Sequence, residues 1–267
     1  MLRPKAVAFL SILACVLLQA ASAAPETLVS FQSAVRSAEA GQRPGATIRG
    51  YLTKPKGDGP FPAVVLMHSC LGLPAARKSI ADLYARLGYI ALFVDEFTTR
   101  GIKETCARDF NEGVADAYGA LLALSKLPYV DTKRIAVVGY SQGADTVLQL
   151  ASARFGSAFG VPNGLDFKAA AAFYPPCANQ AEVKLAIPTL ILVGRSDEVT
   201  PAADCEQLAK NQPDLKLVVY PGAHHLFDDR SLAGGKRVLG MWLQYDARAA
   251  EQSKSELRDF LAARLLR

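Results

Sequence analysis

The feature that most constrains the fold of this chain is a regular alternation of short apolar runs with segments of helical pattern. The apolar runs cover residues 62–67, 90–95, 134–139, 168–174, 188–194 and 215–220. They are almost continuously apolar, which is typical of strands that are covered on both faces. The segments between and after them that predict helices lie at about 74–87, 109–127, 141–154, 200–211, 231–247 and 251–266.

Strands that alternate with helices predict an α/β protein with an open, mainly parallel sheet and helices on both faces. Within residues 141–154, Ala144, Val147, Leu148 and Ala151 recur at helical spacing, so one helix face should pack on the sheet. Residues 47–53 read as part of an edge hairpin before the first central strand. No internal repeat or proline-rich linker divides the chain, and we expect one domain over residues 24–267.

The N-terminal segment, residues 1–23, reads as a secretory signal peptide. Arg3 and Lys5 give it a basic start, Ala6–Leu18 is almost wholly apolar, and Ala21–Ala23 fits the small-x-small cleavage rule. The apolar stretch is short for a membrane span, which needs ~20 residues, and no later segment is long enough. We therefore expect an exported protein, periplasmic or secreted, with an uncleaved N-terminal anchor as the alternative.

Composition and cysteine content narrow the class of protein. With 51% hydrophobic and 21% charged residues, the chain is too apolar for a disordered protein. The net charge of +5 is spread along the chain, so we expect no nucleic-acid partner.

Beyond the leader the cysteines are Cys70, Cys106, Cys177 and Cys205. An even number in an exported chain indicates disulfides, with three possible pairings, or else free buried thiols. No CxxC spacing occurs, so we expect no metal site.

The strongest motif is Gly-Tyr-Ser-Gln-Gly at residues 139–143, which fits G-x-S-x-G. It directly follows one predicted strand and directly precedes a predicted helix, as the nucleophile elbow of a hydrolase requires. Gly139 and Gly143 supply the small residues that such a sharp turn needs. Ser141 would then lie at a helix N-terminus, where backbone amides favour developing negative charge. The alternative is an ordinary turn in which Ser141 caps the helix.

A serine nucleophile needs a base, and the chain has only three histidines. His224 and His225 follow the last predicted strand, in the late loop where the hydrolase fold carries its base. His68 follows the first central strand, and we expect it to hold that loop by a hydrogen bond rather than to act in catalysis.

The imidazole in turn needs a carboxylate to fix its tautomer. Asp197 lies three residues beyond the strand predicted at 188–194, and the order Ser141, Asp197, His225 is that of α/β-hydrolases. Glu198 is the nearest rival, but we interpret it as a solvated loop charge. Residues 228–229 lie too close to the histidines in sequence to orient them, and we read them as a helix cap.

Taken together, these residues resemble the dienelactone hydrolase family of the α/β-hydrolase superfamily, as an exported member with a serine nucleophile. The resemblance covers about residues 45–245. It is carried by VVLMHSCLGL (64–73), DEFTTRG (95–101), RIAVVGYSQG (134–143), AFYPPC (172–177), LVGRSDEVTPAADC (192–205) and YPGAHHLFD (220–228). It implies the α/β-hydrolase fold, with Ser141 as nucleophile, Asp197 as acid and His225 as base.

The chain departs from the family pattern at several positions. The founding enzymes use a cysteine nucleophile where this chain has Ser141, and their first-loop glutamate corresponds to Ser69. Both changes favour a conventional serine triad and put the dienelactone substrate in question. Arg100 corresponds loosely to an arginine that binds the substrate carboxylate, whereas Asp229 falls near a second such arginine. Tyr140 is a further candidate for contact with the substrate.

The oxyanion hole of such an enzyme needs two backbone donors. One is the N–H of Gln142, and by the resemblance the other is the N–H of Cys70. Cys106 follows the next strand on the same rim of the predicted sheet, so a Cys70–Cys106 disulfide is the favoured pairing. Cys177 and Cys205 would then join two later loops.

The sequence therefore predicts an ester-bond hydrolase that cleaves a small carboxylic ester or lactone through an acyl-enzyme. No cofactor is required, and the expected partner is a small-molecule substrate. The alternatives are a peptidase or other acyl hydrolase on the same fold, or a non-catalytic binding protein that keeps the fold. The sequence leaves the oligomeric state open.

Overall fold

The computed structural model describes residues 25–36, 44–152, 156–180 and 183–266. The predicted signal peptide, residues 1–23, lies outside the described residues. The strands are β1 (Thr27–Gln32), β2 (Thr47–Thr53), β3 (Phe61–Met67), β4 (Ile90–Asp95), β5 (Val130–Tyr140), β6 (Ala169–Phe173), β7 (Thr189–Gly194), β8 (Leu215–Tyr220), β9 (Lys236–Val238) and β10 (Met241–Leu243). The α-helices are α1 (Arg77–Arg86), α2 (Gly113–Ser125), α3 (Gln142–Ser152), α4 (Ala202–Ala209) and α5 (Ala247–Leu265).

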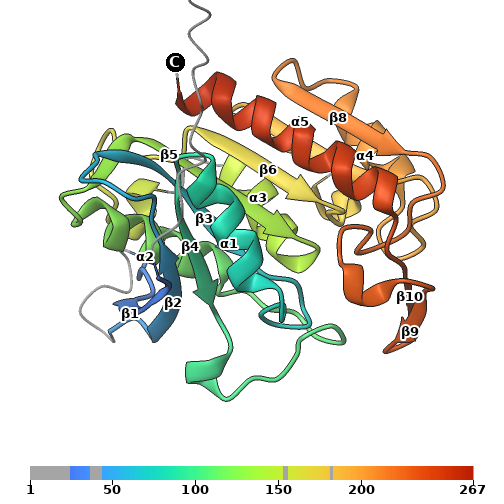
Figure 1. The fold of residues 1–267 in the computed structure, drawn as a ribbon, viewed down its shortest axis with the longest axis horizontal. Helices are drawn as coiled ribbons and strands as arrows, with labels where there is room; N and C mark the ends of the chain where they lie inside the picture. Colours follow the sequence, from blue (N-terminus) through green and yellow to red (C-terminus); the bar gives the residue numbers. More distant parts are fainter. Residues whose placement is uncertain (1–24, 37–43, 153–155, 181–182, 267) are drawn as a thin grey trace, which may run out of the picture.

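A mainly parallel sheet forms the centre of the molecule (Figure 1). Its eight strands follow the order β1-β2-β4-β3-β5-β6-β7-β8. The six strands from β4 to β8 in this order are mutually parallel, while β2 is antiparallel to both of its neighbours, β1 and β4. The sheet confirms the predicted fold class, including the edge hairpin that contains residues 47–53.

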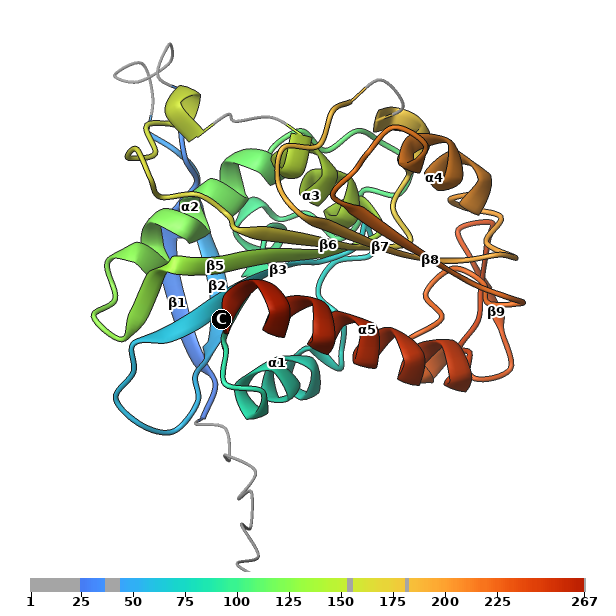
Figure 2. The ribbon, with the colours of Figure 1, turned by 90° about the horizontal axis from the view of Figure 1, so that it is seen from above.

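Helices cover both faces of this sheet, as the alternation of patterns predicted. Figure 2 shows α1 and α5 on one face and α2, α3 and α4 on the other. The strands between them are buried almost without interruption: every residue of β4, β6 and β7 is buried, which explains why their sequences are almost continuously apolar. No helix in the described part of the chain is both long and apolar enough to cross a membrane.

The carboxyl ends of the parallel strands meet at one rim of the sheet. Tyr140 at the end of β5 pairs with Phe173 at the end of β6, and Gly194 at the end of β7 pairs with Tyr220 at the end of β8. Loops that are far apart in the sequence therefore leave the sheet side by side. This register brings the loops after β3, β5, β7 and β8 to the same rim.

One predicted element is wrong. The helix predicted at 231–247 is absent, and only residue 247 belongs to an α-helix, as the start of α5. The stretch instead follows a short 3₁₀ turn (Arg230–Leu232) with the two-stranded β9–β10 hairpin, which lies apart from the main sheet at the lower right of Figure 1. The reason is local: Gly234, Gly235 and Gly240 all adopt left-handed φ angles, of 91°, 76° and 84°, which no helix accommodates. The last helix, predicted at about 251–266, begins earlier, at Ala247.

Candidate active site

Ser141 occupies a sharp turn between β5 and α3. Its φ angle is 54°, an unusual value for a residue other than glycine, and its N–H donates to Phe173 O at 2.9 Å. The neighbouring backbones approach closely: a Cβ at Gly139 would lie 2.1 Å from Gly143 O, and one at Gly143 would lie 2.4 Å from Met67 O. Only glycine fits at either position, so the two glycines of the motif are what permit the strained turn.

His225 stands between Ser141 and Asp197. Its Nε2 lies 2.9 Å from Ser141 Oγ, and its Nδ1 lies 2.7 Å from Asp197 Oδ2. All three side chains are buried. In this geometry a carboxylate can hold one imidazole nitrogen as N–H, which leaves the other free to accept a proton from the serine hydroxyl.

The carboxylate of Asp197 is held by the loop that follows it. Its Oδ1 accepts the N–H groups of Val199 and Thr200, each at 2.9 Å, and its Oδ2 accepts the Thr200 hydroxyl at 2.9 Å. Thr200 Oγ1 also lies 3.2 Å from His225 Nδ1. Thr200 was not among the residues predicted from the sequence. The signal was present, because an aspartate that accepts the amides two and three residues ahead of it is a common loop-forming pattern.

The residues considered as alternatives to His225 and Asp197 have other surroundings. His224 packs edge-on against Trp242, with ring centroids 6.4 Å apart, and Glu198 is exposed. Asp228 Oδ1 accepts the Tyr174 hydroxyl at 2.8 Å, and desolvation raises the pKa of Asp228 to about 6. Asp229 caps the 3₁₀ turn that follows it by accepting the N–H of residue 231.

The two residues expected to supply oxyanion donors are joined through one buried residue, Thr105, by its backbone N–H on one side and its hydroxyl on the other. The Thr105 N–H donates to Cys70 O at 2.9 Å, and its hydroxyl donates to Gln142 Oε1 at 2.6 Å. Cys70 lines the same small cavity as Ser141. Gln142 is the first residue of α3, so its backbone amide has no acceptor within the helix. Thr105 and Gln142 thus tie the loop after β3 to the elbow.

Both favoured cysteine pairings occur in the structure. Cys70 bonds to Cys106 and Cys177 bonds to Cys205, across 36 and 28 residues of chain. The first disulfide connects the loops after β3 and β4 beside Ser141. The second connects the loop after β6 to α4.

His68 has the role that the sequence analysis expected of it. Its Nδ1 lies 2.8 Å from Ser69 O, and its Nε2 accepts the Glu96 N–H at 3.3 Å. The ring therefore connects the loop after β3 to the loop after β4. Because the ring is fully buried, desolvation lowers the pKa of His68 to about 4, so it is neutral at physiological pH.

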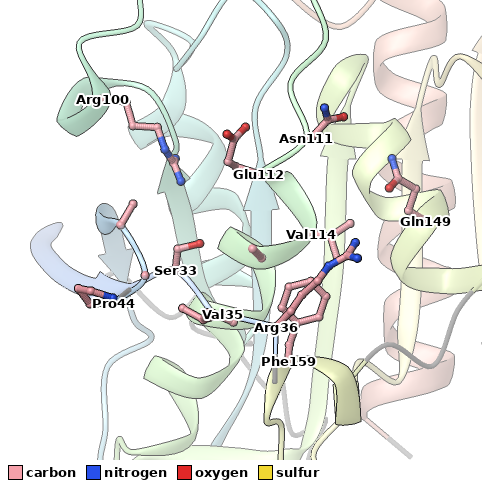
Figure 3. Close-up of a pocket in the computed structure, with 14 residues that line it drawn as sticks. Ser33, Val35, Arg36, Pro44, Arg100, Asn111, Glu112, Val114, Gln149 and Phe159 are labelled. Carbon is pink, nitrogen blue, oxygen red and sulfur yellow. The ribbon is translucent and has the colours of Figure 1, made fainter. Parts of the chain in front are cut away.

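Neither of the two residues predicted to contact the substrate, Arg100 and Tyr140, lines the cavity at Ser141. The Arg100 guanidinium forms a two-fold hydrogen-bonded ion pair with Asp116, at 2.7 and 2.9 Å, and also donates to Glu96 O. It lines a separate pocket of about 590 Å³ (Figure 3). Tyr140 is buried against Phe173, with ring centroids 4.9 Å apart. The buried partner of Arg100 could not be foreseen from a motif match.

Apolar side chains close the space in front of Ser141. The cavity that contains Ser141 and His225 is also lined by Leu71, Leu226, Met241 and Leu243. The last two belong to β10, a strand that the sequence analysis did not predict. Among the described residues, no group of three His, Cys, Asp or Glu side chains could hold a metal ion.

Known proteins resemble this chain in two ways. Curated relatives match the sequence of less than half of the chain, whereas solved structures share the fold of most of it. The enzyme named Esterase FrsA from Shigella boydii is 34% identical over 111 residues, which are 40% of this chain and 26% of FrsA. FrsA of Escherichia coli K12 is 34% identical over 110 residues, with the same coverage. The chain thus spans about a quarter of the length of these relatives.

Two solved structures illustrate the likeness of fold. The dienelactone hydrolase-like promiscuous phosphotriesterase P91, from metagenomic libraries, has a TM-score of 0.66 at 21% identity, covering 90% of this chain and 98% of its own. The dienelactone hydrolase of Anabaena variabilis has a TM-score of 0.61 at 18% identity, with coverage of 90% and 98%. Residues 48–265 match the family model described as the dienelactone hydrolase family. The chain therefore belongs to the dienelactone hydrolase family.

Proposed function

We propose that this protein is a serine hydrolase that cleaves a small carboxylic ester or lactone. The observation that carries the proposal is the position of His225, with Ser141 Oγ at 2.9 Å from one ring nitrogen and Asp197 Oδ2 at 2.7 Å from the other. Membership of the family and the name of the partial relative, an esterase, support an ester substrate. The serine nucleophile and Ser69 distinguish the chain from family members that use cysteine.

In the proposed reaction, His225 Nε2 takes the Ser141 proton as Oγ attacks the ester carbonyl. The carbonyl oxygen becomes an oxyanion, which accepts the backbone amides of Cys70 and Gln142. The tetrahedral intermediate collapses, and the alcohol leaves with the proton from His225. Water then attacks the acyl-enzyme with His225 as base, which releases the acid and restores Ser141. Asp197 holds the imidazole and stabilises its charged form.

We further propose that the protein works outside the reducing cytoplasm. Two disulfides support this location, because such bonds persist in oxidising compartments and are rare in the cytosol. The signal peptide proposed for residues 1–23 agrees with it. Comparison of the N-terminal residue of the periplasmic or secreted protein with Ala24 would test both points at once.

The experiment that tests the hydrolase is the Ser141→Ala variant, assayed by titration of the acid released from a panel of simple esters and lactones. We expect kcat to fall by about 10⁵-fold or more, since a triad serine acts as a unit with its base. The far-ultraviolet circular dichroism spectrum should stay unchanged. A fluorophosphonate probe should label the wild type at Ser141 and leave the variant unlabelled. Equal turnover by the two proteins would refute the assignment, and a wild-type serine inert to the probe would favour a binding protein.

A further inference from the structure

Strand β10 of the β9–β10 hairpin presents two apolar side chains to the nucleophile. Met241 and Leu243 both line the cavity that contains Ser141. Side chains alternate along a strand, so residues 241 and 243 share a face of β10. Trp242 belongs to the opposite face, where its ring fills the space that a Cβ at Gly235 would need. Trp242 therefore packs against the back of the hairpin. On the front, Met241 and Leu243 form one wall of the cavity at Ser141.

This wall leaves little room. The cavity has a volume of about 10 Å³, close to the smallest that holds a single water molecule. Leu71 and Leu226 complete its apolar lining, and Ser141 itself is only 9% exposed. A substrate must fit its reacting group between these side chains, so the wall acts directly on the size of that group.

The wall borders the cavity beside His225. In serine hydrolysis the alcohol oxygen takes its proton from the histidine, here from His225 Nε2, and so it must lie beside that ring. Leu226 follows His225 in the chain, and Leu243 is paired with His225 through an isolated parallel bridge. The Gln244 N–H also donates to His225 O at 3.2 Å. The hairpin thus flanks the base.

Within the hairpin, Met241 occupies the position most open to change. The base of the hairpin is fixed, because Leu243 is buried and the Asp246 N–H donates to Phe227 O at 2.9 Å. The tip is free, since Leu239 is 62% exposed. Met241 lies between them and is half-buried. A different side chain at 241 can therefore alter the wall while the anchored base of the hairpin stays in place.

We propose that Met241 determines the size of the alcohol that this enzyme accepts, and that it restricts the substrates to esters of short alcohols and small lactones. This inference rests on the proposed hydrolase function. A single methylene that an apolar pocket does not accommodate changes kcat/KM by about tenfold or more. The long side chain at 241 therefore has enough influence to decide between an ethyl and a hexyl ester.

The test compares two series of esters, with the released acid titrated at constant pH. Ethyl, butyl and hexyl acetate vary the alcohol, whereas ethyl acetate, butyrate and hexanoate vary the acyl group. In Met241→Ala, the ratio of kcat/KM for hexyl acetate to that for ethyl acetate should rise about tenfold or more. In Met241→Phe, the butyl-to-ethyl ratio should fall. The control, Leu239→Ala at the exposed tip, should keep every ratio within about twofold of wild type.

Each ratio is taken within one protein preparation, so a lower fraction of folded enzyme does not affect it. An unchanged alcohol ratio in both Met241 variants would overturn the inference, as would an equal or larger change in the acyl series. Ser141→Ala separates this failure from failure of the proposed function. If Ser141→Ala abolishes ester hydrolysis and the alcohol ratios do not move, only the role of Met241 is wrong. If Ser141→Ala remains active, the hydrolase assignment itself is wrong.

Discussion

The loops after β3 and β8 each carry a buried histidine at the same rim of the sheet, yet the two rings have opposite surroundings. Both nitrogens of His68 bond to backbone groups, at Ser69 O and the Glu96 N–H. Both nitrogens of His225 face side chains, those of Ser141 and Asp197. The first ring thus fixes the course of the main chain, and the second is available for proton transfer.

The role of a histidine is therefore set by its hydrogen-bond partners and not by the residue type alone. The loop after β3 is expected to supply a backbone amide, that of Cys70. Its supports are the Cys70–Cys106 disulfide and the hydrogen bonds of His68 and Thr105 to main-chain atoms. The loop after β8 is expected to supply a side chain. Its supports orient that side chain through Asp197 and hold its backbone through β10.

The largest test of this comparison replaces each histidine by glutamine. His225→Gln should lower kcat for ester hydrolysis by about 10⁵–10⁶-fold, because in the proposed mechanism His225 acts as a unit with Ser141. His68→Gln should lower kcat by less than about tenfold, since it removes a support rather than a reacting group. Steady-state kinetics on ethyl acetate would measure both. A loss in His68→Gln as large as that in His225→Gln would break the distinction between the two rings.

Much of this architecture is predictable from sequence because its physical signals are local. Strands covered on both faces must be apolar throughout, so their runs stand out in the sequence. An elbow needs glycines at fixed spacing around Ser141. Parallel strands place the loops that follow them at one rim, which is why Asp197 and His225 could be expected near Ser141 although they lie far away in sequence.

The parts that sequence reasoning missed depend on tertiary contacts or on unusual backbone. Residues 231–247 carry a mixed apolar and basic pattern that also fits a helix, and only the left-handed glycines decide for a hairpin. Arg100 was assigned to substrate binding by its resemblance to a family motif. In the structure its guanidinium is instead paired with the carboxylate of Asp116 on α2. Thr105 forms hydrogen bonds with two residues that are distant from it in sequence, Cys70 and Gln142.

The two disulfides offer a second test of the loop after β3. They close chain segments of similar length, 36 and 28 residues, but only Cys70–Cys106 lies beside Ser141. Replacing both cysteines of either pair by serine should lower the free energy of unfolding by about 3–4 kcal/mol, from the loop-closure entropy of the unfolded chain. Loss of the Cys70–Cys106 bond should also lower kcat by about tenfold or more, since a misplaced oxyanion donor stabilises the transition state less well. The Cys177–Cys205 pair serves as the matched control.

The measurements for the disulfide pairs are urea unfolding and steady-state kinetics on the same preparations. In the variant without the Cys177–Cys205 bond, kcat should stay within about threefold of wild type, because neither residue lines the cavity at Ser141. Equal losses of kcat in the two variants would mean that the loop after β3 needs no special support of its backbone.

The smallest expected effect concerns the charge of His68. Burial lowers the pKa of His68 from 6.5 to about 4, so below pH 6.5 the unfolded chain binds a proton that the folded protein does not. The resulting contribution to stability is complete above pH 6.5 and is lost as the pH falls toward 4, by about 3 kcal/mol at most. Asp228, with a pKa raised to about 6, acts in the opposite direction, so the wild type alone does not isolate the effect.

The contribution of His68 is isolated by subtracting the free energy of unfolding of the His68→Gln variant from that of the wild type, because the variant retains Asp228 and the other acidic groups. The wild type should exceed the variant in free energy of unfolding at pH 7, and this advantage should shrink at pH 5 and again at pH 4. Urea titrations at the three pH values measure the difference. A constant advantage across this range would mean that His68 titrates alike in the folded and unfolded chains. The ring would then be accessible to solvent, and its loop would lack the rigid backbone that a preorganised oxyanion donor requires.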